Sequence, residues 1–221
     1  MPPSVLARYA LSLSLALLPV AAAAQEAPAQ TLIRAGRLLD GIAEQPRTDQ
    51  GILVEGERIS RVGPWAEVQA AAPGATVLDL SGMTVLPGLI DNHTHVLLQG
   101  DITSQDYDEQ LLKESIPYRT IRATMAARTA LDHGFTTLRD LETEGAMYAD
   151  VDVRNAINRG VIPGPRMFVA TRAFSATGMY PLSGYSWELK VPEGVQIVDG
   201  VDNIRRAVRE QVKYGADWIK V

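Results

Sequence analysis

The chain has 221 residues, of which 46% are hydrophobic and 21% are charged, and its formal net charge is -5. This composition is typical of a globular protein and excludes a disordered or fibrous chain, and the charges form no basic patch that would favour nucleic-acid binding. There is no cysteine, which excludes disulfides, thiolate nucleophiles and cysteine metal ligands.

The first predicted element is a secretory signal peptide over residues 1–24. Arg8 precedes an apolar run, and Ala22 and Ala24 stand where an A-x-A cleavage site requires small residues. The run has about 12 residues, whereas a membrane-spanning helix needs roughly 20. We therefore expect cleavage after Ala24, no stable membrane anchor, and a secreted or periplasmic protein.

The next segment, residues 25–86, is predicted to be a small β-rich subdomain. Its strand-like runs are rich in Val, Ile and Leu and are bounded by Gly, Pro and Asp. They cover residues 31–40, 51–63 and 75–88. Within the second run, Glu55-Gly56-Glu57 predicts a hairpin turn.

After Pro87 the pattern changes to alternating strands and helices, which predicts a parallel β/α architecture. The predicted strands cover residues 88–98, 135–142, 165–174 and 216–221. The predicted helices cover residues 115–134, 152–160 and 201–215, and each ends in glycine.

Two of the three histidines of the chain lie in the first of these strands, in the stretch PGLIDNHTHV. Because side chains alternate along a strand, His93 and His95 are expected on one face, with Thr94 on the other. They follow the apolar part of the strand, at the end where parallel β/α folds place their chemistry. Paired imidazoles favour metal binding, although two partly exposed histidines beside a loop are the alternative. Asp91 is expected to orient a ligand histidine or the turn.

The stretch PGLIDNHTHV resembles the first barrel strand of the amidohydrolase superfamily of metal-dependent hydrolases. HGFTTLRDLE and GPRMFVATRAFSATG resemble its second and third strands. GADWIKV resembles its fourth strand, in the branch of imidazolonepropionase and Xaa-Pro dipeptidase (prolidase). The resemblance implies an α/β fold in which residues 87–221 are the N-terminal half of a (β/α)8 TIM barrel, strands one to four. Residues 25–86 are then part of a preceding β-sandwich.

The resemblance also implies a metal site. His93 and His95 would hold one ion, and Lys220, as a carboxylated lysine, would bridge to a second. The ions are expected to be two divalent metals, with zinc favoured, and a hydroxide between them would attack an amide carbonyl. Taken without the resemblance, Lys220 is better interpreted as a surface lysine at a frayed terminus.

Further site residues, two histidines and a proton-transferring aspartate, are implied beyond Val221, and no residue of this chain is expected as the catalytic acid or base. We therefore expect an N-terminal fragment that is poorly folded and inactive alone. His133 is expected to end a helix rather than to replace the missing ligands.

Three further residues are weaker candidates. Asp140, at the end of the second strand, either supports the metal site or caps the next turn. Tyr180 and Tyr185 lie in a long loop after the third strand. They either line a substrate pocket, together with Trp187, or only pack the loop.

The leading hypothesis is an exported hydrolase of carbon–nitrogen bonds in dipeptides, Xaa-Pro peptides or N-acyl amino acids. Cyclic amides are the second substrate class. The alternative is an exported metal-binding module without catalysis. The expected partner is a small amide or dipeptide, and the oligomeric state is left open, with a homo-oligomer as one arrangement.

Overall fold

The structure is a computed structural model, and it describes residues 29–100, 104–180 and 182–221. The signal peptide predicted over residues 1–24 lies outside the described residues. The chain divides into two compact units, Met1–Leu86 and Pro87–Val221. None of the described helices is long and apolar enough to cross a bilayer.

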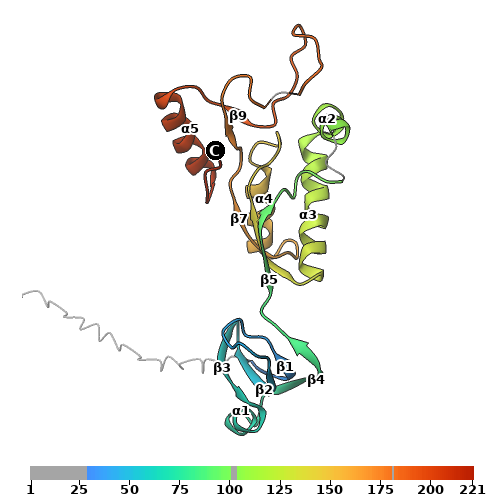
Figure 1. The fold of residues 1–221 in the computed structure, drawn as a ribbon, viewed down its shortest axis with the longest axis vertical. Helices are drawn as coiled ribbons and strands as arrows, with labels where there is room; N and C mark the ends of the chain where they lie inside the picture. The colour runs from blue at the N-terminus through green and yellow to red at the C-terminus, as the bar shows by residue number, and fades with distance from the viewer. Residues whose placement is uncertain (1–28, 101–103, 181) are drawn as a thin grey trace, which may run out of the picture. The chain divides into compact units, whose positions relative to one another are not determined.

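The first unit is built on a four-stranded sheet in the order β3-β2-β1-β4 (Figure 1). β1 and β2 pair antiparallel, as do β2 and β3, whereas β1 and β4 run parallel. The β2–β3 hairpin turns at Gly56, where a φ of 60° favours glycine, as the sequence predicts. The strands are β1 Gln30–Leu38, β2 Arg47–Glu55, β3 Arg58–Pro64 and β4 Thr76–Val85.

A short helix, α1 (Trp65–Ala71), is not among the predicted elements. It packs on the sheet through Val68, which is fully buried in one cluster with Leu32 and Leu53. A Cβ at Gly51 would lie only 2.8 Å from the Cβ of Val68, so glycine permits this close approach. The described part of this unit contains one sheet, and a β-sandwich with a second sheet stays a prediction.

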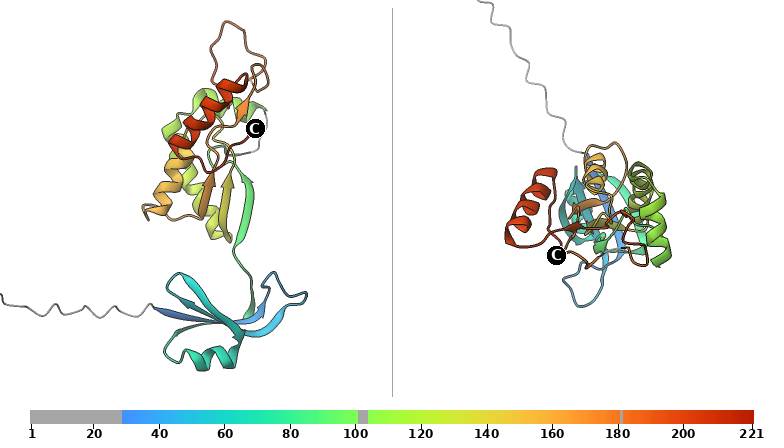
Figure 2. Two further views of the ribbon diagram at one scale, coloured as in Figure 1. Left: turned by 90° about the vertical axis from the view of Figure 1, so that its left-hand side faces the viewer. Right: turned by 90° about the horizontal axis from the view of Figure 1, so that it is seen from above.

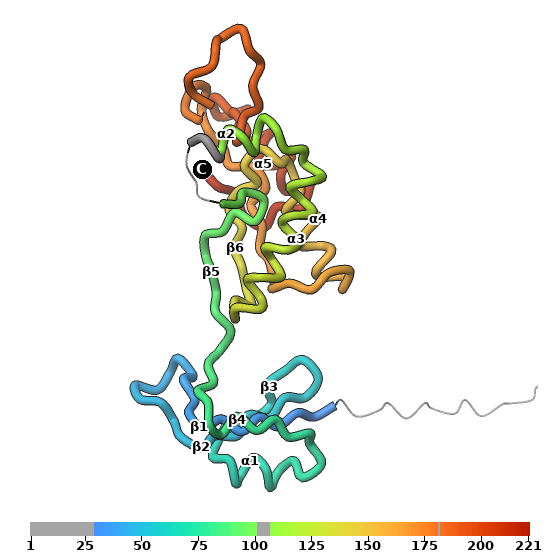
Figure 3. The backbone as a smooth tube through the Cα atoms, turned by 90° about the vertical axis from the view of Figure 1, so that its right-hand side faces the viewer, coloured from blue at the N-terminus to red at the C-terminus, as the bar shows by residue number. Residues whose placement is uncertain are grey.

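The second unit is built on a parallel sheet in the order β5-β6-β7. Figure 3 follows the alternation of strand and helix along the chain. The strands are β5 Leu89–Thr94, β6 Phe135–Asp140 and β7 Arg166–Val169, with a small parallel pair, β8 Phe174–Ser175 and β9 Gln196–Ile197. The helices are α2 Ser104–Lys113, α3 Ile116–Asp132, α4 Ala149–Asn158 and α5 Val201–Tyr214.

Helices α3 and α4 cover one face of this sheet (Figure 2). Ala123 of α3 and Val153 of α4 share a buried cluster with Leu138 of β6 and Val169 of β7. α3 begins where the side chain of Ser115 accepts a hydrogen bond from a backbone N–H of its first turn. The amphipathic pattern of the sequence thus positions the strand ends that bear the candidate site.

The prediction of one continuous strand over residues 165–174 is wrong, because the strand is interrupted in its middle. The chain leaves the extended conformation at Thr171, whose φ of 60° lies in the left-handed region. The segment therefore forms two short strands, β7 and β8, rather than one.

The strand predicted over residues 216–221 is also wrong, because this segment runs beside β7 without forming a ladder. The backbone N–H groups of Asp217 and Trp218 both donate to the carbonyl of Val169, at 2.8 and 3.2 Å. The Asp217 carboxylate in turn accepts the Val169 N–H at 2.9 Å. A side chain thus takes the donor that a neighbouring strand would use.

Candidate metal site

The two histidines of the H-x-H stretch lie side by side. β5 ends at Thr94. His93 is therefore the second-last residue of the strand, and His95 is the first residue after the strand. The centroids of the two imidazole rings are 5.1 Å apart, with an angle of 58° between the rings. Thr94 is directed instead to β6, where its hydroxyl lies 3.4 Å from the carboxylate of Asp140. The alternation expected for this strand is therefore observed.

The loop that follows β6 brings two buried glutamates to these histidines. Nδ1 of His95 lies 3.2 Å from the backbone oxygen of Glu142 and 3.5 Å from Oε1 of Glu144. One ligand atom from each of these three side chains can be chosen so that all lie within 4.8 Å of one another. Nitrogen and carboxylate oxygen at this spacing are donors that a divalent ion can use together.

Lys220 reaches the same place from the other end of the unit. Its Nζ lies 3.1 Å from Oε2 of Glu142, and the two side chains are 26% and 1% exposed, respectively. The other oxygen of Glu142, Oε1, is buried and has no hydrogen-bond partner among the described residues. Lys220 is thus paired with a buried glutamate of this cluster and is not a free surface side chain.

The charges of this cluster are set by burial and by close neighbours. Burial and the charge of Glu144 raise the pKa of Glu142 to about 7, although the Lys220 ammonium acts in the opposite direction. Burial also lowers the pKa of His95, against the opposing effects of the Glu142 carbonyl and the Glu144 charge. Burial therefore favours the neutral form of the His95 imidazole, which is the form that binds metal.

The donor set fits a divalent metal ion. A backbone carbonyl only accepts hydrogen bonds, so the Nδ1 of His95 that faces the Glu142 carbonyl has to bear the proton. This leaves the lone pair on Nε2 for a metal, the usual arrangement of a ligand histidine. The unpartnered oxygen of Glu142 also gains a partner if a cation binds.

The two aspartates near the histidines support the backbone. Oδ1 of Asp91 accepts a hydrogen bond from the backbone N–H of His93 at 3.0 Å, within the part of β5 where the register with β6 is irregular. Asp140 is fully buried, and its Oδ1 accepts the backbone N–H of Val96 at 2.8 Å. Burial, reinforced by the charge of Asp150, raises the pKa of Asp140 well above its usual range.

The two tyrosines of the long loop have different positions. The hydroxyl of Tyr180 lies 3.4 Å from Oε2 of Glu144, beside the site. The hydroxyl of Tyr185 instead donates to Oδ2 of Asp108 at 2.9 Å, and Trp187 is 92% exposed. Contact of these residues with substrate stays a prediction.

The third histidine is not part of the cluster. Nδ1 of His133 lies 2.8 Å from the backbone oxygen of Thr129, and His133 ends α3. This is the helix-end position that the sequence predicts.

Glu142 and Glu144 are the site residues that the sequence analysis missed. They lie in LETEG, where Glu142 is the last residue of the strand predicted over residues 135–142 and Glu144 follows two residues later. Polar residues at the carboxyl end of a parallel strand were the signal used for His93 and His95, and the same signal applies to these glutamates.

Comparison with known proteins identifies the family of the chain. A family model described as "Amidohydrolase family" matches residues 84–221. The chain belongs to the amidohydrolase family. A second model, "Imidazolonepropionase-like composite domain, bacteria", matches residues 51–75 of this amidohydrolase. The resemblance seen in the strand sequences is thus confirmed.

Ochratoxinase from Aspergillus niger is 30% identical to this amidohydrolase over 233 residues, covering 96% of this chain and 45% of the relative. A Xaa-Pro dipeptidase solved with methionine in its active site superimposes with a TM-score of 0.74 at 31% identity, covering 86% of this chain and 46% of that one. A prolidase in complex with N-methylphosphonate-L-proline gives a TM-score of 0.71 at 29% identity, with the same coverages. The chain spans about half the length of the curated relatives it matches.

Proposed function

We propose that the protein containing this chain hydrolyses carbon–nitrogen bonds of peptide-like amides, with Xaa-Pro dipeptides and N-acyl amino acids as the leading substrates. The observation that carries the proposal is that His95 and Lys220 both contact Glu142, with the His93 ring beside His95, in a chain of the amidohydrolase family. The neighbours described as a Xaa-Pro dipeptidase and a prolidase support the substrate class. The imidazolonepropionase-like match supports cyclic amides as the second class.

In this proposal His93 and His95 would hold one divalent ion through imidazole nitrogen, and Lys220, as a carboxylated lysine, would supply carboxylate-type oxygen to that ion and to a second one. Zinc is the expected metal, because neutral imidazole and carboxylate-type oxygen both suit it. When bound, the ions supply Lewis-acid polarisation of the scissile carbonyl and a lowered pKa for attacking water.

Carboxylation changes the partner of Glu142. The Lys220 ammonium loses one proton to become an amine, and the amine nitrogen then forms a bond to the carbon of carbon dioxide and loses a second proton, so a cation becomes a carbamate anion. Glu142, now 3.1 Å from the Lys220 ammonium, would then face a second negative charge. Divalent cations balance two such anions, which makes carboxylation and metal loading mutually dependent. We propose no catalytic acid or base among the residues of this chain.

The architecture proposed for the whole protein follows the family. We propose that residues 87–221 supply strands one to four of a (β/α)8 barrel and that residues 25–86 contribute to a β-sandwich. The three parallel strands β5, β6 and β7 support the first assignment. From the predicted signal peptide over residues 1–24, we further propose a secreted or periplasmic location.

The test is an activity panel on the natural full-length protein with Xaa-Pro dipeptides, N-acyl amino acids and cyclic amides. We expect turnover of the first two classes, loss of activity in His95→Asn, and unchanged activity in His133→Asn, which alters a histidine outside the cluster. Activity confined to cyclic amides would contradict the dipeptidase assignment. Tight metal binding with no turnover of any class would favour the metal-binding module instead.

A further inference from the structure

Glu144 contacts three side chains that come from three different segments. Its Oε1 lies 3.5 Å from Nδ1 of His95. Its Oε2 accepts a hydrogen bond from the hydroxyl of Tyr107 at 3.0 Å and lies 3.4 Å from the hydroxyl of Tyr180. Tyr107 belongs to α2 and Tyr180 to the loop between β8 and β9, so one carboxylate joins both segments to the histidine.

The backbone holds this carboxylate in place. Glu144 has a φ of 49°, a left-handed conformation that is strained for a residue with a side chain. The buried guanidinium of Arg119 donates to the backbone oxygens of Thr143 and Glu144, at 3.2 and 2.8 Å. Arg119 thus holds Glu144 in its strained conformation. Backbone strain that the surrounding structure maintains in this way indicates a functional role for the orientation of Glu144.

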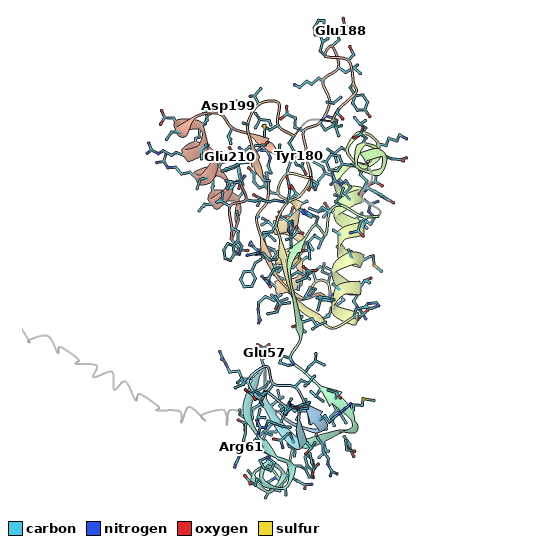
Figure 4. The ribbon with its side chains drawn as sticks, in the orientation of Figure 1. Glu57, Arg61, Tyr180, Glu188, Asp199 and Glu210 are labelled. Atoms are coloured by element: carbon cyan, nitrogen blue, oxygen red, sulfur yellow. The ribbon has the colours of Figure 1, made fainter. Side chains whose placement is uncertain are left out.

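The long loop between β8 and β9 packs against the tyrosines that contact the Glu144 carboxylate. The rings of Tyr107 and Tyr180 meet edge to face, with centroids 6.4 Å apart. A Cβ at Gly194 would lie 1.8 Å from the Tyr107 hydroxyl, so only glycine lets the returning arm of the loop pass here. In Figure 4, Tyr180 lies near the base of this loop, and Glu188 lies far out toward its tip.

We propose that Glu144 is the positioning residue of His95 and that it couples metal binding to the order of the loop over residues 177–195. The inference rests on the proposed function, since it requires His95 to be a metal ligand. A carboxylate beside Nδ1 fixes the ring and makes Nε2 a better donor to metal. The same carboxylate anchors the loop through Tyr107 and Tyr180, so metal binding and loop order stabilise each other reciprocally.

The first measurement is the zinc affinity of the natural full-length protein, by competition with a chromophoric chelator. Glu144→Gln keeps the size of the side chain and removes its charge, and we expect zinc to bind about 10- to 100-fold more weakly. Asp150→Asn makes the same change at another buried carboxylate, which accepts backbone hydrogen bonds from Val151 and Thr171. This control is expected to keep the zinc affinity of the unsubstituted protein.

The second measurement is hydrogen exchange of residues 177–195 with and without zinc. Zinc is expected to slow exchange in this loop of the unsubstituted protein and to have no such effect in Glu144→Gln. Tyr180→Phe removes one loop anchor and leaves Glu144 intact, so it tests the coupling even if Glu144→Gln does not fold. Loss of the zinc-dependent protection in Tyr180→Phe supports the coupling.

Three results would overturn the inference. Equal zinc affinity of Glu144→Gln and the unsubstituted protein would remove the positioning role. Zinc-dependent protection that persists in Tyr180→Phe and Glu144→Gln would remove the coupling. Absence of zinc binding by the unsubstituted protein would contradict the proposed function itself, and the inference with it.

Discussion

Glu142 is a buried carboxylate whose charge is balanced by one lysine. Its Oε2 lies 3.1 Å from Nζ of Lys220, and its Oε1 has no hydrogen-bond partner among the described residues. A buried anion that loses its cation keeps the full cost of desolvation. The stability of the second unit is therefore sensitive to changes at Lys220.

Lys220→Met is expected to lower the free energy of unfolding by about 1–3 kcal/mol, because it leaves Glu142 unpaired. The control Lys190→Met removes an exposed lysine of the long loop and is expected to change stability by less than about 0.5 kcal/mol. Urea unfolding measures both. Adding Glu142→Leu to Lys220→Met should recover most of the loss, and a double variant that is no more stable than Lys220→Met alone would contradict this account.

Asp150 predicts a dependence of stability on pH. Burial raises its pKa from 3.8 to about 7, although backbone N–H groups of Thr171 and Val151 oppose this. The native state therefore binds more protons than the unfolded state between these values. By linkage, the contribution of Asp150 to the free energy of unfolding falls as pH rises from about 4 to about 7, and is constant above that.

Asp150→Asn removes this titration, so its free energy of unfolding should fall less steeply over the same window. The measurement is urea unfolding of both proteins at pH 5 and at pH 8. Parallel pH profiles for the two proteins would show that the native Asp150 carboxyl has an ordinary pKa.

The sequence predicts the positions of those residues whose placement depends only on the strand or helix that contains them. His93 and His95 are brought together by the strand period alone, and His133 is placed by its helix end. The roles of Glu142 and Glu144 depend on a strained loop and on a lysine 78 residues away from Glu142. No short window of sequence contains that information.

At the scale of elements, the close packing of α1 on β2 depends on Gly51. A Cβ there would lie 2.8 Å from the Cβ of Val68, whereas at Gly63 of β3 the nearest atom of Val68 would be 3.5 Å away. The first distance is an overlap and the second is an ordinary contact.

Gly51→Ala is therefore expected to destabilise the first unit by about 1–3 kcal/mol. Gly63→Ala is the matched control and should be neutral or slightly stabilising, because alanine restricts the unfolded chain. Thermal unfolding compares them, and equal midpoints for both variants would refute the close packing of α1.

Most helices and strands could be located from hydrophobic periodicity, and the failures have local causes. α1 has seven residues, too few for a clear helical period. The segment 216–221 reads as a strand, yet the Asp217 side chain takes the Val169 N–H that the ladder requires. A side chain competing with the backbone cannot be seen in a pattern of apolar residues.

At the scale of the whole molecule, the second unit leaves apolar side chains on its sheet uncovered. Ile90 of β5 and Phe168 of β7 are 60% and 41% exposed, and Trp218, in the segment beside β7, is 49% exposed. Exposed apolar residues on and beside a sheet favour association with another molecule.

A polypeptide limited to residues 25–221 is therefore expected to self-associate at micromolar concentration. Size-exclusion chromatography with light scattering measures this, and Phe168→Lys should reduce the association. A stable monomer that unfolds cooperatively would contradict the expectation.

The central claim is that His93 and His95 hold metal in this amidohydrolase. The most direct test is the zinc content of the natural full-length protein after dialysis, measured by mass spectrometry. We predict about two zinc ions per chain, loss of zinc in the double variant His93→Asn/His95→Asn, and full retention in His133→Asn. Equal zinc content with and without the histidine pair would contradict the account.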